Sequence, residues 1–305
     1  MASLRLRWLR WLGWSAAGLL ILCVSLALLY GLGWWVRSLE RPPREPLQVD
    51  LAGGARYERI VWDIPRPVLW HVVTIPLTDT TEFVLTPPQP SSALETLAQT
   101  TSQFAESQTV DIAINGSYFK PHHATHLLDY YPRAGDPVDI HGPARTNGVT
   151  LSDEPRVDPM ACLTWDGRRL TITSDQPAPT ATDVITGLPR VLWNGRRVGP
   201  MHATRTYARV AAGIDPEGQT LWLVAVDGSQ SGYSEGVTYL ELADFLMDLG
   251  ATDALALDGG GSTTLVLRDS PGAWQVVNAP YHTHIPMRER PVANHLGIRL
   301  GAKER

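Results

Sequence analysis

Hydrophobic positions divide the chain into one long apolar run and a larger region of short elements. The run, residues 11–36, has no charged residue and exceeds the roughly 20 residues that cross a bilayer as a helix. From about Tyr57 onward, short stretches rich in Val, Ile and Thr alternate with turn residues. The pattern predicts one membrane-spanning helix followed by a globular, strand-rich domain.

Two segments of the globular region have helical signals. Residues 92–104 begin with Ser92 and Glu95 at the spacing of a capping box, and residues 237–249 have Glu241 at the matching position of another. Both segments are therefore predicted as helices.

The rest of the globular region is predicted to consist mainly of strands. Residues 116–147 show no clear periodicity and predict a long loop. The predicted strands are 68–77, 81–86, 109–115, several short ones within 149–198, 208–214, 219–226, 254–257, 263–268, 273–277 and 295–300. Many strands with few helices indicate an α+β fold. We expect a single domain of mixed, largely antiparallel sheet with a few helices, preceded by one N-terminal transmembrane helix.

The N-terminal segment also predicts where the domain lies. Arg5, Arg7 and Arg10 precede the apolar run, and basic residues stay on the cytoplasmic side, which puts the domain in the periplasm or outside the cell. The run is long and no small-x-small site follows it, so an uncleaved signal anchor is favoured over a cleaved signal peptide. The predicted organisation is a cytoplasmic basic segment (1–10), a transmembrane signal anchor (11–36), a Pro-rich linker (37–56), the domain (57–301) and a tail (302–305).

Composition excludes several function classes. The chain has 305 residues, 44% of them hydrophobic, and a net charge of −5, which argues against extensive nucleic-acid binding. Lys120 and Lys303 are the only lysines, which disfavours Schiff-base chemistry. Cys23 lies in the apolar run and Cys162 in an apolar segment, so no disulfide framework is expected.

The segment 253–264, DALALDGGGSTT, has the strongest chemical signal. A short apolar strand ends at Asp258 and is followed by three glycines and three hydroxyl residues. Glycines allow a sharp turn that lies close to a bound group, and consecutive N–H groups form a concavity suited to an anion. The competing interpretation is an ordinary turn in which Asp258 bonds its own backbone.

Three further polar clusters lie at the ends of predicted strands. NGSYF begins at Asn115 and DGS begins at Asp227, each directly after a strand, and RERPVAN ends at Asn294, before the last strand. Each cluster alone is typical of a turn. Together, at strand ends, they indicate a site assembled on a rigid frame.

In this order, the pieces resemble the phosphodiester glycosidase domain family over residues 66–301. The most specific pieces are RVAAGID from Arg209, VDGS from Val226, GVTYLELA from Gly236, LDGGGSTT from Leu257 and ERPVAN from Glu289. NGSYF is similar to the family's NGGFF segment. Ser117, Ser229 and the histidine-rich insert between Phe119 and Asn147 depart from the family pattern, which concerns substrate identity more than reaction type.

The resemblance implies hydrolysis of a sugar-1-phosphodiester at the anomeric carbon. A phosphomonoester leaves readily because its second pKa is about 6, so the site needs an anion cradle, a carboxylate and groups that bind hydroxyls. Asp258 and Asp227 are the candidate catalytic carboxylates, with Glu241 in reserve, and which is nucleophile or base stays open. The candidate substrate-binding residues are Asn115, Arg209, Gly259, Gly260, Gly261, Ser262, Thr263, Arg290 and Asn294.

Within this set, the arginines and the glycine turn are expected to hold the phosphate, since Arg pairs with phosphate through two hydrogen bonds. Asn115 and Asn294 would bind sugar hydroxyls or position Asp258. The expected partners are a sugar-phosphate or glycoconjugate substrate and a membrane, reached through the N-terminal helix, and no nucleic acid.

The histidine-rich insert raises the question of a metal ion. His122 and His126 are four residues apart and could share one ion if their segment were helical. Exposed loop histidines are commoner than ligands, so we expect no required cofactor and leave metal binding open.

Two other function classes compete. A non-catalytic envelope module could use the same pocket to bind sugar-phosphate polymers, although it would not need to retain Asp227, Asp258, Arg209 and Asn294 together. A serine hydrolase that uses Ser262 is disfavoured because Ser262 lies in GGSTT, which is not a G-x-S-x-G elbow.

Overall fold

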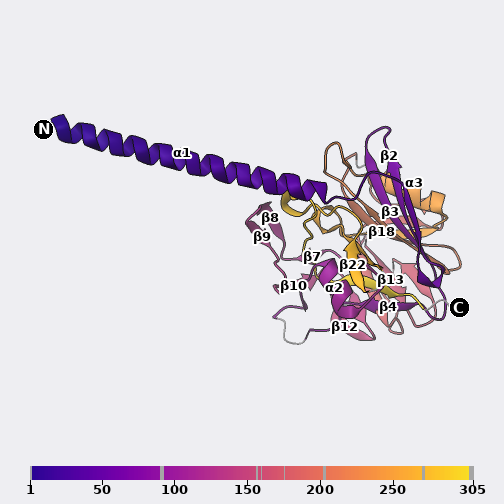
Figure 1. Ribbon diagram of the computed structural model, residues 1–305. Coiled ribbons are helices and arrows are strands. Elements are labelled where there is room, and N and C mark those ends of the chain that lie inside the picture. The colour runs from indigo at the N-terminus through magenta and orange to yellow at the C-terminus, as the bar shows by residue number, and fades with distance from the viewer. Residues whose placement is uncertain are drawn as a thin grey trace.

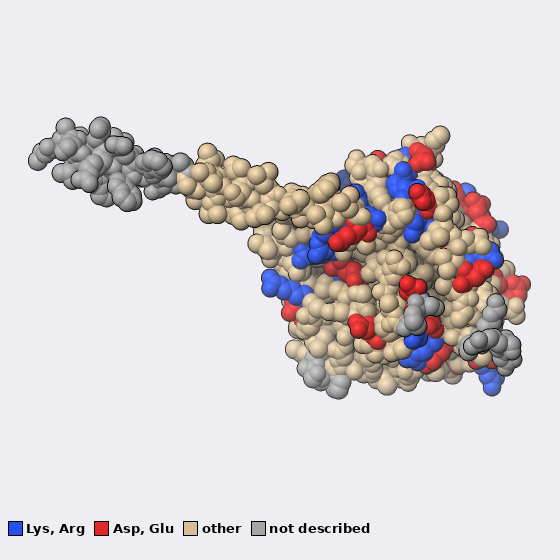
Figure 2. Space-filling view, viewed as in Figure 1, with Lys and Arg blue, Asp and Glu red and all other residues tan. Residues whose placement is uncertain are grey.

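The computed structural model describes residues 2–89, 93–155, 157–158, 160–174, 176–201, 204–269 and 272–301, with side chains from residue 18 onward. Its first element, the helix α1 (Ala2–Leu39), projects from the domain (Figure 1). Residues Gly18–Leu39 are long and apolar enough to cross a membrane, although a signal sequence would pass the same test. The described part of α1 is free of charge until it meets the domain, where charged residues of both signs gather (Figure 2).

The domain is organised around an eight-stranded antiparallel sheet with the order β1-β2-β3-β19-β18-β20-β16-β17. Its strands are β1 (Leu47–Asp50), β2 (Arg56–Trp62), β3 (Val68–Pro76), β19 (Thr220–Val226), β18 (Arg209–Ile214), β20 (Asp253–Leu257), β16 (Arg190–Trp193) and β17 (Arg196–Arg197). Because β18 runs antiparallel to both neighbours, Arg209 pairs with Val226 and Val210 pairs with Leu257. One end of the sheet therefore brings together the start of β18 and the residues that follow β19 and β20.

Smaller sheets complete the described β structure. One five-stranded sheet contains β22 (Ala273–Val276), β21 (Leu265–Asp269), β6 (Ile112–Asn115), β23 (His295–Arg299) and β4 (Glu82–Leu85), in that order. Another contains β12 (Val149–Ser152), β11 (Ala144–Thr146), β15 (Asp183–Gly187), β13 (Ala161–Trp165) and β14 (Leu170–Thr173). A three-stranded sheet contains β5 (Thr96–Leu97), β10 (Pro137–Ile140) and β7 (Phe119–Lys120), and β8 (His123–His126) pairs with β9 (Asp129–Tyr131) as a hairpin.

Both faces of the large sheet are buried. Val73 and Leu223 belong to the core between this sheet and the two five-stranded sheets, whereas Trp70 and Val224 pack on the other face, under α3. The helix α3 (Tyr239–Leu249) begins at the predicted capping box and buries its apolar side. Burying one such large side chain contributes roughly 1.5–3 kcal/mol. The predicted α+β fold, largely antiparallel and preceded by one apolar helix, is confirmed.

The first predicted helix is wrong in position. The helix α2 spans Thr101–Gln108, and Thr100, not Ser92, is its N-cap. Ser92 lies outside the described residues, and Glu95 Oε2 accepts a hydrogen bond from Ile140 N at 2.7 Å. This tertiary contact holds the segment beside β10, where Thr96 and Leu97 form β5.

The long loop predicted over 116–147 is also wrong, because this segment contributes β7 to β11. Each of these strands has two to four residues, too few to show periodicity in the sequence. The linker predicted over 37–56 overlaps the end of α1 and contributes β1 to the large sheet.

Candidate active site

Asp258 follows β20, and its carboxylate lies at the centre of a polar cluster. Ser262 Oγ donates to Asp258 Oδ2 at 2.6 Å, and the Gly259 N–H also bonds the carboxylate. Asn115 Nδ2 donates to the Asp258 carbonyl oxygen at 2.6 Å, and Asp258 N donates to Gly116 O at 3.0 Å. Both the backbone and the side chain of Asp258 are therefore fixed in position.

Burial raises the pKa of Asp258 to about 6, against the lowering effects of the Arg290 charge and of the hydrogen bonds from Ser262 and Gly259. Such a carboxyl group is ionised at neutral pH yet only weakly stabilised in that form. These are the properties of a carboxylate that accepts a proton or attacks a carbon atom.

Arg290 is held beside this carboxylate by two acceptors. Its Nη1 donates to Ser262 Oγ at 3.1 Å and its Nε donates to His282 Nδ1 at 3.2 Å. Gly261 leaves room for the guanidinium, because a Cβ there would lie 2.6 Å from Arg290 Nη2. The Ser262 hydroxyl thus links a cationic and an anionic side chain.

A cavity of about 160 Å³ opens beside Arg290, and we call it the Arg290 cavity. Its wall includes Gly228, Ser229, Gly260 and Gly261 from the strand ends, and Ala124, Thr125 and His126 from the β8–β9 hairpin. Ser229 has a φ of 59°, in the left-handed region that few residues other than glycine adopt. Strained backbone of this kind is concentrated at ligand sites.

An aromatic group also lies near Asp258. The Arg209 guanidinium lies 3.8 Å from the centre of the Tyr239 ring, and Arg209 Nε donates to Val237 O at 3.4 Å. Burial raises the pKa of Tyr118, and the Asp258 charge and a hydrogen bond with Tyr239 raise it further, while Arg209 lowers it. The Tyr118 hydroxyl therefore stays protonated within electrostatic range of Asp258.

Asp227 occupies a different environment. Its side chain has 0% exposure. Oδ1 accepts from Ala279 N at 2.8 Å and from Asn278 Nδ2 at 3.0 Å, and Oδ2 lies 3.0 Å from His71 Nε2. The other ring nitrogen, His71 Nδ1, bonds the Tyr57 hydroxyl at 2.8 Å. Protein groups occupy both carboxylate oxygens, so Asp227 connects β19 to β3 and to the segment after β22.

Several other predicted residues make structural contacts. Glu241 Oε2 accepts from Thr238 N and from Arg66, which makes it a helix cap and an ion-pair partner. Asn294 Oδ1 accepts from Ser117 N at 2.7 Å. Thr263 is buried. The structure thus gathers Asp258, Ser262, Arg290 and the three glycines in one place, and gives Asp227, Glu241, Asn115 and Asn294 contacts that hold this frame together.

His282 is a member of the cluster that sequence reasoning missed. It is 1% exposed, its Nδ1 accepts from Arg290, and its Nε2 is buried without a hydrogen-bond partner. Burial and the neighbouring Arg290 and Arg288 charges lower the pKa of His282 to about 3, so the ring is neutral. Its only sequence signal was its place in YHTH, shortly before the Arg288–Asn294 cluster.

The histidine-rich insert does not have the helical geometry on which shared metal binding by His122 and His126 depended. His126 lies on β8, a strand, so His122 and His126 lack the helical spacing. Within the described ranges, no group of three or more His, Cys, Asp or Glu side chains could hold a metal ion. His122 instead lies near Arg290: burial, followed by the Arg290 and His123 charges, lowers its pKa to about 4.

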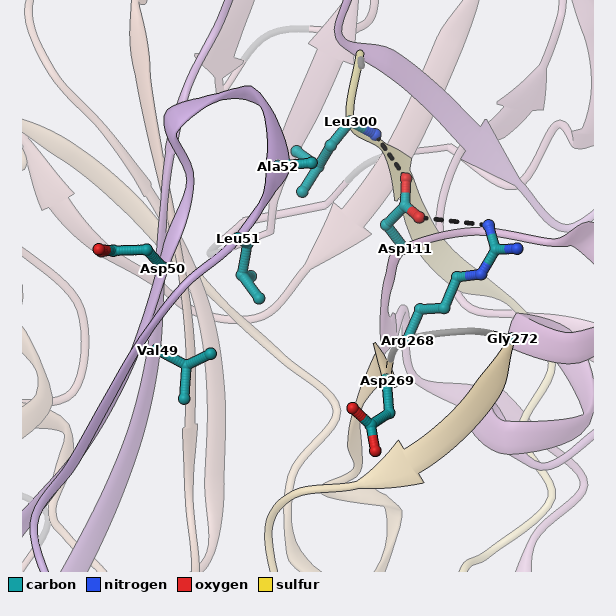
Figure 3. A pocket seen from close by; sticks show the side chains of 9 residues that line it. All are labelled: Val49, Asp50, Leu51, Ala52, Asp111, Arg268, Asp269, Gly272 and Leu300. Atoms are coloured by element: carbon teal, nitrogen blue, oxygen red, sulfur yellow. Dashed lines mark hydrogen bonds and ion pairs between the residues drawn. The ribbon is translucent and has the colours of Figure 1, made fainter. Parts of the chain in front are cut away.

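A larger cavity, about 480 Å³, contains none of these residues among those that line it. Figure 3 shows its polar side chains, which include the carboxylates of Asp50, Asp111 and Asp269. Asp111 accepts a hydrogen bond from Leu300 N at 2.8 Å and pairs with Arg268 at 3.5 Å. Asp111 is thus paired with groups of the protein itself, and no residue of the Asp258 cluster lines this cavity.

Comparison with known proteins gives one family. A family model described as phosphodiester glycosidase matches residues 108–299. No curated protein sequence matches at a significant level.

Three solved structures are similar in fold. The catalytic domain of zebrafish N-acetylglucosamine-1-phosphodiester α-N-acetylglucosaminidase, auto-inhibited by its pro-peptide, has a TM-score of 0.58 and 21% identity, with 85% of this chain and 86% of that chain covered. A hypothetical protein from Synechocystis has a TM-score of 0.57 and 16% identity over 84% of this chain, which spans 64% of that protein. A Burkholderia pseudomallei protein has a TM-score of 0.53 and 16% identity, with 76% and 74% covered.

Proposed function

The chain belongs to the phosphodiester glycosidase family, and we propose that it is a membrane-anchored, extracytoplasmic hydrolase that cleaves sugar-1-phosphodiester bonds. The observation that carries the proposal is the Ser262 hydroxyl, which joins the Asp258 carboxylate to the Arg290 guanidinium beside an open cavity. A phosphodiester of a sugar needs a cation for its phosphate and a carboxylate at its anomeric carbon, and this arrangement supplies both.

In this proposal the phosphate binds in the Arg290 cavity. Arg290 Nη2 lies against Gly261 in the wall of this cavity, so the guanidinium supplies the cation for the phosphate. The N–H groups of Gly259, Gly260 and Ser262 are already bonded to acceptors of the protein itself. The neutral His282 ring accepts a hydrogen bond from Arg290 Nε through its Nδ1 and so fixes the guanidinium.

The sugar then lies against the Tyr118 and Tyr239 rings, with its anomeric carbon at Asp258. The bond between that carbon and the phosphate oxygen breaks, water supplies the new oxygen on the sugar, and one water proton ends on the phosphomonoester. Asp258 acts at the anomeric carbon, as nucleophile or as the base that activates water. The phosphomonoester is a good leaving group, so no second carboxylate is needed as an acid.

The test uses the full chain in detergent with a panel of sugar-1-phosphodiesters. We expect the ³¹P signal of the diester to convert to that of a monoester, with release of a reducing sugar. A preparation of Asp258→Asn is the matched control. Tight binding of the same compounds without product would instead identify a non-catalytic sugar-phosphate-binding module, and the proposed activity would be rejected.

A further inference from the structure

The end of the large sheet that forms the candidate site is also the end at which α1 leaves the domain. Val226 pairs with Trp70 and Val68 pairs with Trp62, so the last residues of β19 and β2 lie at the same end. Arg44, five residues after α1, bonds the Trp62 carbonyl oxygen at 3.2 Å there. The anchor and the site therefore share one side of the domain.

Side-chain contacts fix the segment after α1 against the wall of the Arg290 cavity. Arg41 Nη1 donates to Gln230 Oε1 at 3.3 Å, and the Arg41 guanidinium lies 4.5 Å from the centre of the Tyr233 ring. Tyr233 Oη donates to Pro42 O at 2.8 Å. Gln230 is buried and directly follows Ser229, which lines the cavity. Only one residue separates the end of α1 at Leu39 from Arg41, so the cavity cannot move far from the anchor.

The β8–β9 hairpin forms the other wall of the cavity. Figure 1 shows this hairpin on the side of the domain from which α1 projects. Arg288 holds it in place, because Nη1 donates to Leu127 O at 3.3 Å and the guanidinium lies 4.5 Å from the centre of the Tyr130 ring. At the turn, Leu128 is 75% exposed.

One exposed leucine is ordinary on a protein surface. An exposed leucine at the tip of a hairpin that lines the proposed phosphate cavity, on the side of the domain from which an apolar helix projects, matches the arrangement that places an apolar side chain among lipid headgroups. Residues 124–126 of the same hairpin line the Arg290 cavity, two to four residues before Leu128.

We propose that the substrate is a glycophospholipid embedded in the same membrane as α1, with its phosphodiester at headgroup level. This inference rests on the proposed function and names the group on the far side of the phosphate. Hydrolysis breaks the bond between the anomeric carbon and the phosphate oxygen. Water gives its oxygen to the sugar, which diffuses away, and a proton to the phosphate, which stays on the lipid.

The experiment compares two substrates with one sugar, using the full chain reconstituted in phospholipid vesicles. One substrate carries a long-chain alkyl group on the phosphate and inserts into the vesicle, and the other carries a methyl group and is soluble. We expect at least about tenfold higher turnover of the alkyl substrate when it shares a vesicle with the protein, and little turnover when it is in separate vesicles.

Leu128→Ser is the test variant, and Val149→Ser is its control, since Val149 is 49% exposed on β12, at the lower edge of the domain in Figure 1. Leu128→Ser should lower turnover of the alkyl substrate about fivefold to tenfold and leave turnover of the methyl substrate unchanged. A factor of this size corresponds to part of the free energy of moving a leucine side chain from water into an apolar environment. Val149→Ser should change neither rate.

The outcomes separate the two proposals. Equal turnover of the two substrates, or equal effects of Leu128→Ser on both, would overturn the membrane inference and leave the hydrolase proposal standing. Turnover of neither substrate would overturn both.

Discussion

Asp258 and Asp227 have the same local sequence context but lie in different environments in the folded protein. Each follows an apolar strand of the large sheet, each precedes glycine, and each is buried. The Asp227 oxygens are occupied by Ala279, Asn278 and His71. The Asp258 carboxylate is bonded by Ser262 and Gly259 and lies in a cluster that opens to a cavity through Arg290. A carboxylate whose oxygens are fully hydrogen-bonded by protein donors stabilises the fold. A carboxylate that can still accept a hydrogen bond and lies beside a cavity is available for chemistry.

The largest expected effect comes from Asp258→Asn. We expect kcat on a sugar-1-phosphodiester to fall about 10³-fold or more, because amides are poor bases and nucleophiles. Stability should change in the opposite direction. The pKa of Asp258 is raised in the folded protein, so wild-type stability falls as pH rises from about 4 through 6.

Asn removes this penalty, so the variant should be more stable than wild type at pH 8, by up to about 3 kcal/mol, and no more stable below pH 4. Calorimetric Tm at both pH values and kcat on the same preparation measure the two effects. Near-normal turnover by the variant would remove Asp258 from the mechanism.

Asp227→Ala is the reciprocal experiment. It leaves the Ala279 N–H and His71 Nε2 without their acceptor, and Asn278 Nδ2 with one acceptor of two, in a buried place, at a cost of about 3 kcal/mol or more. Asp227→Asn should cost less, since the amide oxygen can still accept from Ala279. Urea denaturation gives the stability, and kcat per folded molecule should change less than about tenfold. If stability were normal and kcat fell as far as in Asp258→Asn, the two carboxylates would share the chemistry.

The pH profile sharpens the assignment of Asp258. We expect kcat/KM to fall about tenfold per pH unit below pH 6, as the carboxylate takes up a proton. Ser262→Ala removes a hydrogen bond that lowers this pKa, so the acidic limb should move to higher pH. Initial rates between pH 4 and 8 decide the matter, and a flat profile through pH 6 would contradict the assignment.

The smallest effect is expected from Glu241→Gln. Glu241 caps α3 and pairs with Arg66 in a partly buried position, and Gln can still accept at the cap, so its loss should cost about 1 kcal/mol. We expect kcat to be unchanged at saturating substrate. A loss of turnover at full stability would return Glu241 to the list of catalytic carboxylates.

Local sequence signals predicted those helices and strands whose formation depends on residues close together in the chain. The helix α3 begins at its capping box, and β3, β18, β19 and β23 lie where branched and apolar residues predicted strands. Prediction failed where a residue far away in the sequence determines the local structure. Glu95 was expected to cap a helix, yet it bonds Ile140, 45 residues away. Strands β7 to β11 are shorter than any readable period, so only their pairing reveals them.

The same distinction holds at the candidate site. The sequence alone determined that Asp258 lies at the end of a strand, next to a glycine turn, and its partner Ser262 is only four residues away. The tertiary structure decided that Arg290 and His282 lie beside it and that Asp227 does not share its environment. The partners of Asp227 are 156 residues away at His71 and 51 at Asn278. A glycine turn, a nearby hydroxyl side chain and the end of a strand all affect residues close to them in the chain, so the sequence is enough to predict their effect. Whether a buried carboxylate is fully hydrogen-bonded or has free acceptor capacity depends on which donors the folded chain brings to it, and only tertiary packing determines those donors.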